Sequence, residues 1–247
     1  MIPKIIHYCW FGGEKPKKIE KCIKNWKAIL PDYKIVEWNQ NNFDINEFQY
    51  TIDAYKARKF AFVSDVARVK ALMEYGGIYL DTDVKVFKSF DAILKHKCVF
   101  GFEEGNYVAT SFMAAESNHP VIRKLYEEYR FSSFYDTKGE IIPGTNVSKL
   151  TNILIEYGLQ RDNSFQLLGE DIVVYPQEFF SPYDYTNCIH KTTNNTICEH
   201  LFYVSWMSWQ VRIKKYVKKI VGPIIGKKGM NKLRKTINLL CLKLKRN

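Results

Sequence analysis

Two aspartates, Asp81 and Asp83, stand two residues apart directly after the apolar run 78–80 in this chain of 247 residues. Side chains two apart in an extended segment project to the same side, so both carboxylates can reach one ligand. Carboxylate oxygens are the ligands that Mg²⁺ and Mn²⁺ prefer, and these ions also bind phosphate oxygens. The spacing therefore predicts a site for Mn²⁺ or Mg²⁺ that can hold a nucleoside diphosphate.

An acid and a guanidinium precede this pair. Asp65 and Arg68 are three residues apart in a segment with helical apolar spacing, so both lie on the polar side of that helix. Two interpretations are open for them. They either present a ligand-binding pair near the aspartates or form an ion pair on the helix surface, which would add little stability.

The surrounding pattern predicts the elements that position these groups. Gly76-Gly77 ends the helix, because glycine adopts left-handed backbone cheaply, and the buried strand 78–80 follows. Upstream, a strand, a helix and a second strand form a unit that favours a parallel sheet. Ligands bind beyond the carboxyl ends of such strands, so Trp10 and the two aspartates are expected at one edge. The predicted strands cover 4–10, 34–38, 78–80, 98–102, 107–114, 165–168 and 172–175, and the predicted helices 16–30, 63–75, 120–131 and 146–157.

A long stretch of the chain resembles a known family. Residues 57–84, ARKFAFVSDVARVKALMEYGGIYLDTDV, are similar to the central signature of glycosyltransferases with the DXD sugar-binding region. This family, family 32-like, includes initiating mannosyltransferases, capsular polysaccharide and lipopolysaccharide transferases, and clostridial glucosylating toxins. Residues 2–13, IPKIIHYCWFGG, resemble its first strand and nucleotide-binding turn, and 175–182 with 200–206 resemble its closing segment.

The resemblance implies a fold and a domain boundary. It implies an α/β chain with a GT-A type nucleotide-sugar transferase fold over 1–209, in which helices flank a Rossmann-like, mostly parallel central sheet. A C-terminal basic helical tail, 210–247, follows. Leu201 stands where the family often has a second histidine, and Gly144-Thr145 stands where Gly-Pro is common.

Residue roles follow from the same resemblance. Asp83 is expected to bind the metal directly, and Asp81 to contact the ribose or sugar. Asp65 and Arg68 are expected to bind donor-sugar hydroxyls. For Trp10, His7, Tyr8 and His200, packing in the core is the open alternative. The predicted catalytic residues are Asp65, Arg68, Asp81 and Asp83; the predicted metal ligands are Asp83, Asp81 and His200; the predicted donor-binding residues are His7, Tyr8, Trp10, Asp65, Arg68, Tyr79, Asp81, Ser205 and Trp206.

The basic charge is concentrated in the tail. Residues 211–247 contain thirteen Lys and Arg and no Asp or Glu, which accounts for the net charge of +11. Two basic amphipathic segments there are typical of helices that lie on an anionic membrane surface. Packing on a partner or on the core, and a nucleic-acid patch, are the alternatives. No aromatic residues alternate with the basic ones as in an RNA-binding sheet, so no nucleic-acid partner is predicted.

The composition and the pattern of apolar runs indicate the cellular compartment. With 46% apolar residues the chain can bury one large core. The six cysteines are scattered without a Cys-x-x-Cys pair, which favours reduced thiols. No charged-then-apolar leader precedes the first strand, and no apolar run approaches the roughly 18 residues that span a bilayer. We expect a cytoplasmic protein, attached peripherally to the inner face of the membrane.

The predicted function is transfer of a hexose, with retention, from a nucleoside-diphosphate sugar, by analogy a UDP-sugar, to a hydroxyl of a surface-glycan acceptor. That acceptor is expected to be capsule, lipopolysaccharide or a lipid-linked oligosaccharide. Two other classes stay open: a non-catalytic membrane adaptor on a transferase fold, and a phosphotransferase that uses the first Asp of a DxD motif as nucleophile. Glu170 and Asp171 are either site acids or part of a turn.

Overall fold

The computed structural model describes residues 1–142, 146–184, 189–203 and 229. The chain divides into two compact units, one of residues 1–182 and 192–201 and the other of residues 183–191 and 202–247. The basic tail 210–247, apart from Gly229, and the predicted boundary after residue 209 lie outside the described residues. In the second unit, β10 (Tyr183–Asp184) pairs with β11 (Ile189–His190) in an antiparallel hairpin.

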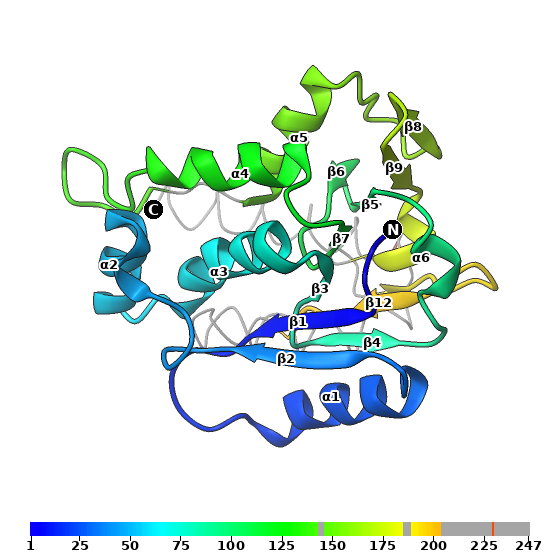
Figure 1. The fold of residues 1–247 in the computed structure, drawn as a ribbon, viewed down its shortest axis with the longest axis horizontal. Coiled ribbons are helices and arrows are strands. Elements are labelled where there is room, and N and C mark those ends of the chain that lie inside the picture. Colours follow the sequence, from blue (N-terminus) through cyan, green and yellow to red (C-terminus); the bar gives the residue numbers. More distant parts are fainter. Residues whose placement is uncertain (143–145, 185–188, 204–228, 230–247) are drawn as a thin grey trace. The chain divides into compact units, whose positions relative to one another are not determined.

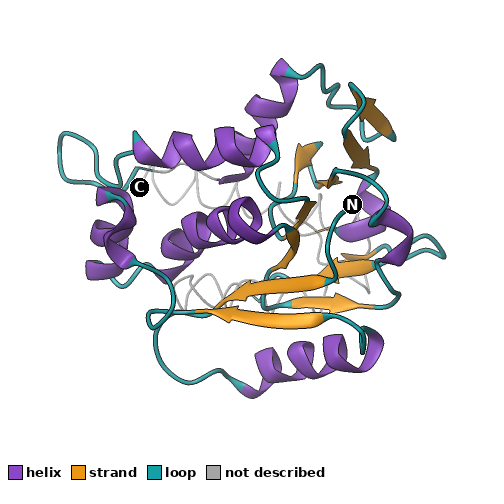
Figure 2. Ribbon diagram, in the orientation of Figure 1, coloured by secondary structure: helices purple, strands orange, loops and turns teal. Residues whose placement is uncertain are grey.

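The first unit is built on one mixed sheet with strand order β2-β1-β3-β7-β5-β9-β8, to which β6 is added through β5. Strands β2, β1, β3, β5 and β9 run in one direction, and β7 and β8 run in the other. The predicted α/β class with a mostly parallel central sheet is therefore confirmed (Figures 1 and 2). The strands are β1 (Ile5–Cys9), β2 (Lys34–Trp38), β3 (Gly77–Leu80), β5 (Cys98–Glu103), β6 (Tyr107–Val108), β7 (Phe112–Ala115), β8 (Gln166–Leu168) and β9 (Ile172–Tyr175).

Helices cover the sheet because each carries one apolar stripe. The α1 helix buries Ile19, Cys22, Ile23 and Trp26, the stripe that the sequence predicts. In Figure 1, α1 and α3 lie on opposite sides of β1 and β2. The helices of this unit are α1 (Lys17–Ile29), α2 (Gln49–Lys56), α3 (Phe60–Tyr75), α4 (Pro120–Arg130), α5 (Asn146–Glu156) and α6 (Gln177–Phe180).

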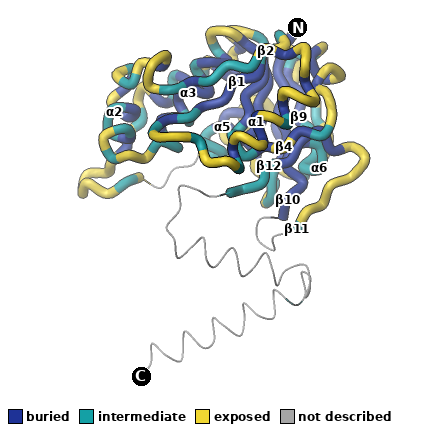
Figure 3. Tube along the Cα trace, turned by 90° about the horizontal axis from the view of Figure 1, so that it is seen from below, coloured by how far each residue is buried: buried dark blue, intermediate teal, exposed yellow. Residues whose placement is uncertain are grey.

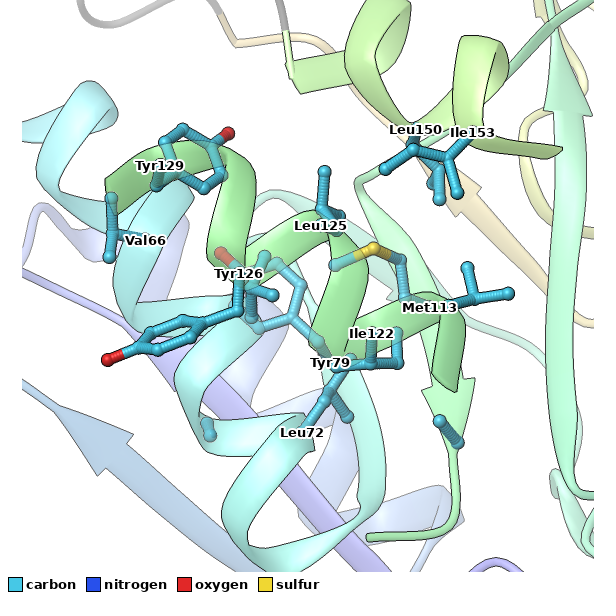
Figure 4. Close-up of a cluster of buried hydrophobic side chains, with 14 of the residues drawn as sticks. Val66, Leu72, Tyr79, Met113, Ile122, Leu125, Tyr126, Tyr129, Leu150 and Ile153 are labelled. Carbon is cyan, nitrogen blue, oxygen red and sulfur yellow. The ribbon is translucent and has the colours of Figure 1, made fainter. Parts of the chain in front are cut away.

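A large core cluster lies where three helices meet the middle of the sheet. Burial of its aliphatic and aromatic side chains contributes about 1.5–3 kcal/mol each. The central strands are buried, and exposed residues lie on the connecting loops and on the outer faces of the helices (Figure 3). Figure 4 shows the side chains that converge there: Val66 and Leu72 from α3, Ile122, Leu125, Tyr126 and Tyr129 from α4, Leu150 and Ile153 from α5, Tyr79 from β3 and Met113 from β7.

The Gly76-Gly77 break has a steric reason. Both residues have positive φ, +64° at Gly76 and +107° at Gly77. A Cβ on Gly77 would lie 2.6 Å from the carbonyl oxygen of Ile5, so β1 and the start of β3 approach too closely for any side chain. The tight turn brings the helix directly into the strand that ends at Asp81.

One predicted strand is interrupted. The pattern over 107–114 predicts a continuous strand, but the structure has β6 and β7 separated by residues 109–111. In this gap the carbonyl of Thr110 accepts from Arg68 Nη1 at 2.9 Å, and the carbonyl of Ser111 accepts from the backbone N–H of Asp81 at 2.9 Å. The bond between Asp81 and Ser111 continues the register of β3 with β7, whereas the carbonyl of Thr110 bonds to a side chain. Propensity does not record such a contact.

The sequence also left some elements unpredicted. Helix α2 lacks a long apolar period, and the short strands β4 (Val84–Val86) and β12 (Cys198–His200) form a separate antiparallel pair. Of the described cysteines, Cys9, Cys22, Cys98 and Cys198 are buried thiols. None of the helices in the described parts of the chain is both long and apolar enough to cross a membrane.

Candidate metal and donor site

Three potential metal ligands converge after the end of β3. Asp81 and Asp83 follow the strand directly, and β12 runs antiparallel to β4 with His200 opposite Val84. This pairing brings His200 Nε2 to 3.1 Å from Asp83 Oδ1 and 3.9 Å from Asp81 Oδ2. One ligand atom from each residue lies within 4.8 Å of the others.

The donor atoms fit a divalent cation. Two carboxylate oxygens and one imidazole nitrogen form a mixed set that Mn²⁺ accepts, and Mg²⁺ is compatible with the two carboxylates. Burial by itself lowers the pKa of His200, but the carboxylates of Asp83, Asp81 and Glu103 raise it above its usual value. A cation at this point would take over the attraction that now favours a proton on His200.

Arg68 is buried beside these carboxylates. Its side chain reaches Asp65 Oδ1 at 3.0 Å through Nη2 and Asp81 Oδ1 at 3.2 Å through Nη1, and Nε donates to the carbonyl of Ser64. The residue is only 5% exposed. A surface ion pair, one of the two interpretations open from the sequence, is therefore wrong, because the polar side of α3 faces the interior.

Tyr79 links the guanidinium of Arg68 to Asp81, one of the candidate metal ligands. The Arg68 guanidinium lies 4.6 Å from the centre of the Tyr79 ring, and the Tyr79 hydroxyl donates to Asp81 Oδ1 at 2.9 Å. Burial alone would lower the pKa of Arg68, but Asp81, Tyr79 and Asp65 raise it, so its positive charge is permanent. A fixed cation beside a candidate metal site is suited to hold negative charge.

Asp65 has an unusual environment for a carboxylate. Burial is the main cause that raises its pKa to about 7, and Asp81 raises it further, whereas Arg68 and Asn146 lower it. The Nδ2 of Asn146, at the start of α5, donates to Asp65 Oδ1 at 2.6 Å. The carboxyl group of Asp65 is thus held between two helices.

The carboxyl end of β1 lies at the same edge, as predicted. The parallel register pairs His7 with Tyr79, so Trp10 follows β1 where the aspartates follow β3. Trp10 is partly exposed, and its indole N–H donates to the carbonyl of Gly13 at 2.8 Å. The surroundings of Trp10 are those of a loop residue at the site edge, and its role toward a base stays a prediction.

Tyr8 and His7 point into the protein. The hydroxyl of Tyr8 donates to Glu37 Oε2 at 2.5 Å, and Lys15 pairs with the same oxygen at 2.7 Å. His7 is 1% exposed; its Nε2 lies 2.8 Å from the carbonyl of Gly76, and its Nδ1 accepts from Trp38 Nε1 at 3.0 Å. Both side chains therefore pack in the core, which is the alternative to donor binding that the sequence left open.

His7 is expected to make stability depend on pH. Burial lowers its pKa from 6.5 to about 4 in the fold, so the unfolded chain binds a proton first as pH falls. Stability is therefore lost as pH falls from 6.5 toward 4, by up to about 3 kcal/mol. Urea unfolding should give a His7→Gln variant a smaller free energy of unfolding than wild type at pH 7.5. The difference between the two free energies should be about 2 kcal/mol smaller at pH 4.5. If the free energy of unfolding changed with pH in the same way for both proteins, His7 would not be a neutral, buried histidine with a lowered pKa.

Some polar groups beside the candidate site were not predicted from the sequence. Glu103 ends β5; burial raises its pKa to about 7, Asp81 and Glu104 raise it further, and His200 lowers it. Its position after a strand, in the acidic pair Glu103-Glu104, was a usable signal. No sequence signal pointed to the Thr110 carbonyl or the Asn146 amide, because each contacts a residue that is far away in the sequence.

Other predicted residues lie elsewhere. Ser205 and Trp206 are outside the described residues, so their closing role stays a prediction. Glu170 and Asp171 lie in the turn between β8 and β9, where Asp171 pairs with Lys97 at 2.6 Å. That turn precedes β9 at the amino end, opposite the edge that carries the aspartates. Glu170 and Asp171 are therefore part of a turn, the second of the two alternatives from the sequence.

A family comparison agrees with this geometry. Residues 16–100 match the family described as "Glycosyltransferase sugar-binding region containing DXD motif". This region is similar to the DXD glycosyltransferases. The predicted family is thereby confirmed, and the match includes Asp65, Arg68, Asp81 and Asp83. It ends before β7, α5 and His200.

Curated relatives of this DXD glycosyltransferase region include enzymes and a viral protein. The chain is 29% identical over 128 residues to inositol phosphoceramide mannosyltransferase 3 of Schizosaccharomyces pombe, covering 50% of this chain and 36% of that protein. It is 26% identical over 226 residues to the uncharacterized glycosyltransferase L373 of Acanthamoeba polyphaga mimivirus, covering 83% of this chain and 84% of that protein. The chain thus spans only about a third of the length of the yeast relative. These relatives support the predicted transferase class.

Two of the solved structures with similarity are described as glycosyltransferases. One is the PaToxG glycosyltransferase, with a TM-score of 0.49 and 20% identity over 63% of this chain and 68% of that chain. Another is the galactosyltransferase LgtC in complex with donor and acceptor sugar analogues, with a TM-score of 0.46 and 12% identity over 89% of this chain and 95% of that chain.

Proposed function

We propose that the chain is a metal-dependent glycosyltransferase that moves a hexose from a nucleoside-diphosphate sugar to a hydroxyl of a glycan acceptor, with retention. The observation that carries the proposal is the convergence of Asp81, Asp83 and His200 within 4.8 Å, with the buried Arg68 paired to Asp81. Two carboxylates, an imidazole and a fixed guanidinium provide what the binding of a diphosphate needs.

The proposed roles follow the contacts. Asp83, Asp81 and His200 would hold Mn²⁺ or Mg²⁺, which when bound supplies positive charge for the leaving diphosphate. Arg68 holds Asp81 in place and adds a positive charge at the same edge. Asp65, with only 15% of its side chain exposed, accepts hydrogen bonds from the hydroxyls of the donor sugar.

The donor is proposed to be a UDP-sugar, and the relatives add mannose to the sugars worth testing. Inositol phosphoceramide mannosyltransferase 3 is named for transfer of mannose to a lipid. A lipid-linked acceptor, such as a precursor of capsule or lipopolysaccharide, would place the enzyme at the inner face of a membrane. Residues 1–209 form the proposed catalytic domain, and 210–247 the part that binds the anionic surface.

The test of the transferase is release of free nucleotide from UDP-glucose, UDP-galactose, UDP-N-acetylglucosamine and GDP-mannose, with Mn²⁺, Mg²⁺ or EDTA. We expect release from one donor with metal and none with EDTA, because the diphosphate needs the cation to leave. Release that persists in EDTA, or release from no donor by a folded protein, would count against the proposal.

The membrane assignment has its own test. The full chain should sediment with vesicles of phosphatidylglycerol and not with vesicles of phosphatidylcholine. Binding should weaken as salt rises, because basic side chains near an anionic surface contribute about 1 kcal/mol each and are screened. Equal binding to both vesicles, or to neither, would remove the membrane surface from the proposed partners.

A further inference from the structure

The loop that follows α4 presents large apolar side chains to solvent. Phe131 is 83% exposed, Ile142 39% and Tyr135 38%. The loop has a defined shape, because Asp136 Oδ1 accepts from two backbone N–H groups of the loop itself, and the N–H of Ile142 donates to the carbonyl of Phe134 at 3.0 Å. The exposed side chains are therefore held outward by an ordered segment.

This loop packs beside the turn between α2 and α3. The ring of Phe134 is buried, and its centre lies 5.3 Å from that of Phe62 in α3 and 5.8 Å from that of Tyr50 in α2. In Figure 1, α2 and the loop after α4 lie at the same end of α3. Phe62 is three residues before Asp65, about one helical turn. The loop thus lies at the end of α3 that carries the candidate site.

The turn between α2 and α3 adds positive charge at this place. Lys56, Arg58 and Lys59 are exposed, and none of them pairs with a carboxylate in the parts of the chain that the structure describes. Arg58 has φ +56°, a left-handed conformation that glycine adopts with the least strain. The local backbone therefore does not explain why an arginine stands there.

This combination of apolar and basic side chains fits an anionic lipid surface. Residues 54–60 and 130–142 together contain five Lys and Arg but two Asp and Glu, so positive charge is in excess. Aromatic and aliphatic side chains enter the headgroup region, while Lys and Arg bind lipid phosphates. A nucleic acid would use the charges but not Phe131 and Ile142, and an apolar protein partner would leave the charges unpaired.

We propose that this end of the first unit is a docking surface for an anionic phospholipid membrane. The rim surface, as we name it, consists of Lys56, Arg58, Lys59, Phe131, Tyr135 and Ile142. It would hold the Asp65 end of α3 toward the lipid, where the hydroxyl of a lipid-linked acceptor lies. This inference deepens the proposed membrane association, which it rests on, but it uses none of residues 210–247.

The first test places a tryptophan in the rim surface of the full chain. With phosphatidylglycerol vesicles, the emission that Phe131→Trp adds to that of the five native tryptophans should shift to shorter wavelength, and brominated acyl chains should quench it. With phosphatidylcholine vesicles it should stay unchanged. Phe165→Trp is the matched control, because Phe165 is 50% exposed outside the rim surface, and its added emission should not respond to either vesicle.

The second test removes the apolar and the basic groups separately. Phe131→Asp should weaken sedimentation with phosphatidylglycerol vesicles about tenfold or more, because the phenyl ring no longer leaves water. The double variant Arg58→Gln, Lys59→Gln should weaken it about tenfold. Its control, Lys21→Gln with Lys24→Gln, removes the same charge from exposed positions of α1 and should stay within about twofold of wild type. Thermal unfolding should show that all variants are folded.

The outcomes separate this inference from the other proposals. Sedimentation with phosphatidylglycerol vesicles without any response of the tryptophan at position 131 would assign the binding to residues 210–247 and overturn the rim surface. An equal effect of both double variants would also overturn it, because only the net charge would then matter. A chain that does not sediment overturns both membrane proposals. Nucleotide release is measured without vesicles, so the transferase proposal is tested separately.

Discussion

Asp83→Asn is expected to lower metal-dependent nucleotide release by at least about 1000-fold, or about 4 kcal/mol. The amide has nearly the same shape as the carboxylate but lacks the negative charge that binds a hard cation. It also removes the negative charge that His200 Nε2 faces at 3.1 Å, so two of the three candidate ligands are disturbed. The measurement is the release rate with Mn²⁺, beside Mn²⁺ affinity from electron paramagnetic resonance.

Asp171→Asn is the matched control for that variant. Asp171 is an aspartate with 43% of its side chain exposed, and it pairs with Lys97 in the turn before β9. An exposed ion pair contributes about 0–1 kcal/mol, so the control should keep its stability, its Mn²⁺ affinity and its release rate. A release rate for Asp83→Asn within tenfold of wild type would show that Asp83 is not a metal ligand.

Gly77→Ala is expected to destabilise the fold by about 3–5 kcal/mol, through both strain and overpacking. The residue has φ +107°, which alanine rarely adopts, and the new Cβ would lie 2.6 Å from the Ile5 carbonyl oxygen and 3.2 Å from His7 Nε2. Relief requires β1 and β3 to separate, in the middle of the sheet. The melting temperature should fall by roughly 10 °C.

Gly139→Ala separates the two causes. Gly139 also has positive φ, +79°, but a Cβ there meets nothing within 4 Å. This variant should lose only about 1 kcal/mol, the cost of the backbone conformation alone. If both alanine variants melt at the same temperature, the close approach of β1 to Gly77 does not limit the fold.

Local pattern was sufficient for most elements of the first unit. The stripe of α1, the Gly76-Gly77 break and the strands beside them were predicted because each depends on residues within one element or its next neighbour. The sequence also placed Trp10, Asp81 and Asp83 at one edge, since parallel strands end on the same side. The strand break at 109–111 was missed because a local pattern carries no information on contacts with another element, such as that of the Thr110 carbonyl with Arg68.

The sequence by itself determined which residues are proposed to carry the chemistry: Asp65, Arg68, Asp81 and Asp83 stand in one helix, turn and strand, where fixed spacing puts them near each other. Only the tertiary structure decided that Arg68 is buried between Asp65 and Asp81, and that β12 brings His200 to Asp83. It alone decided that Asn146 reaches Asp65 from α5. Periodicity encodes which face of an element is apolar, whereas these contacts depend on strand pairing and helix packing between segments far apart in the chain.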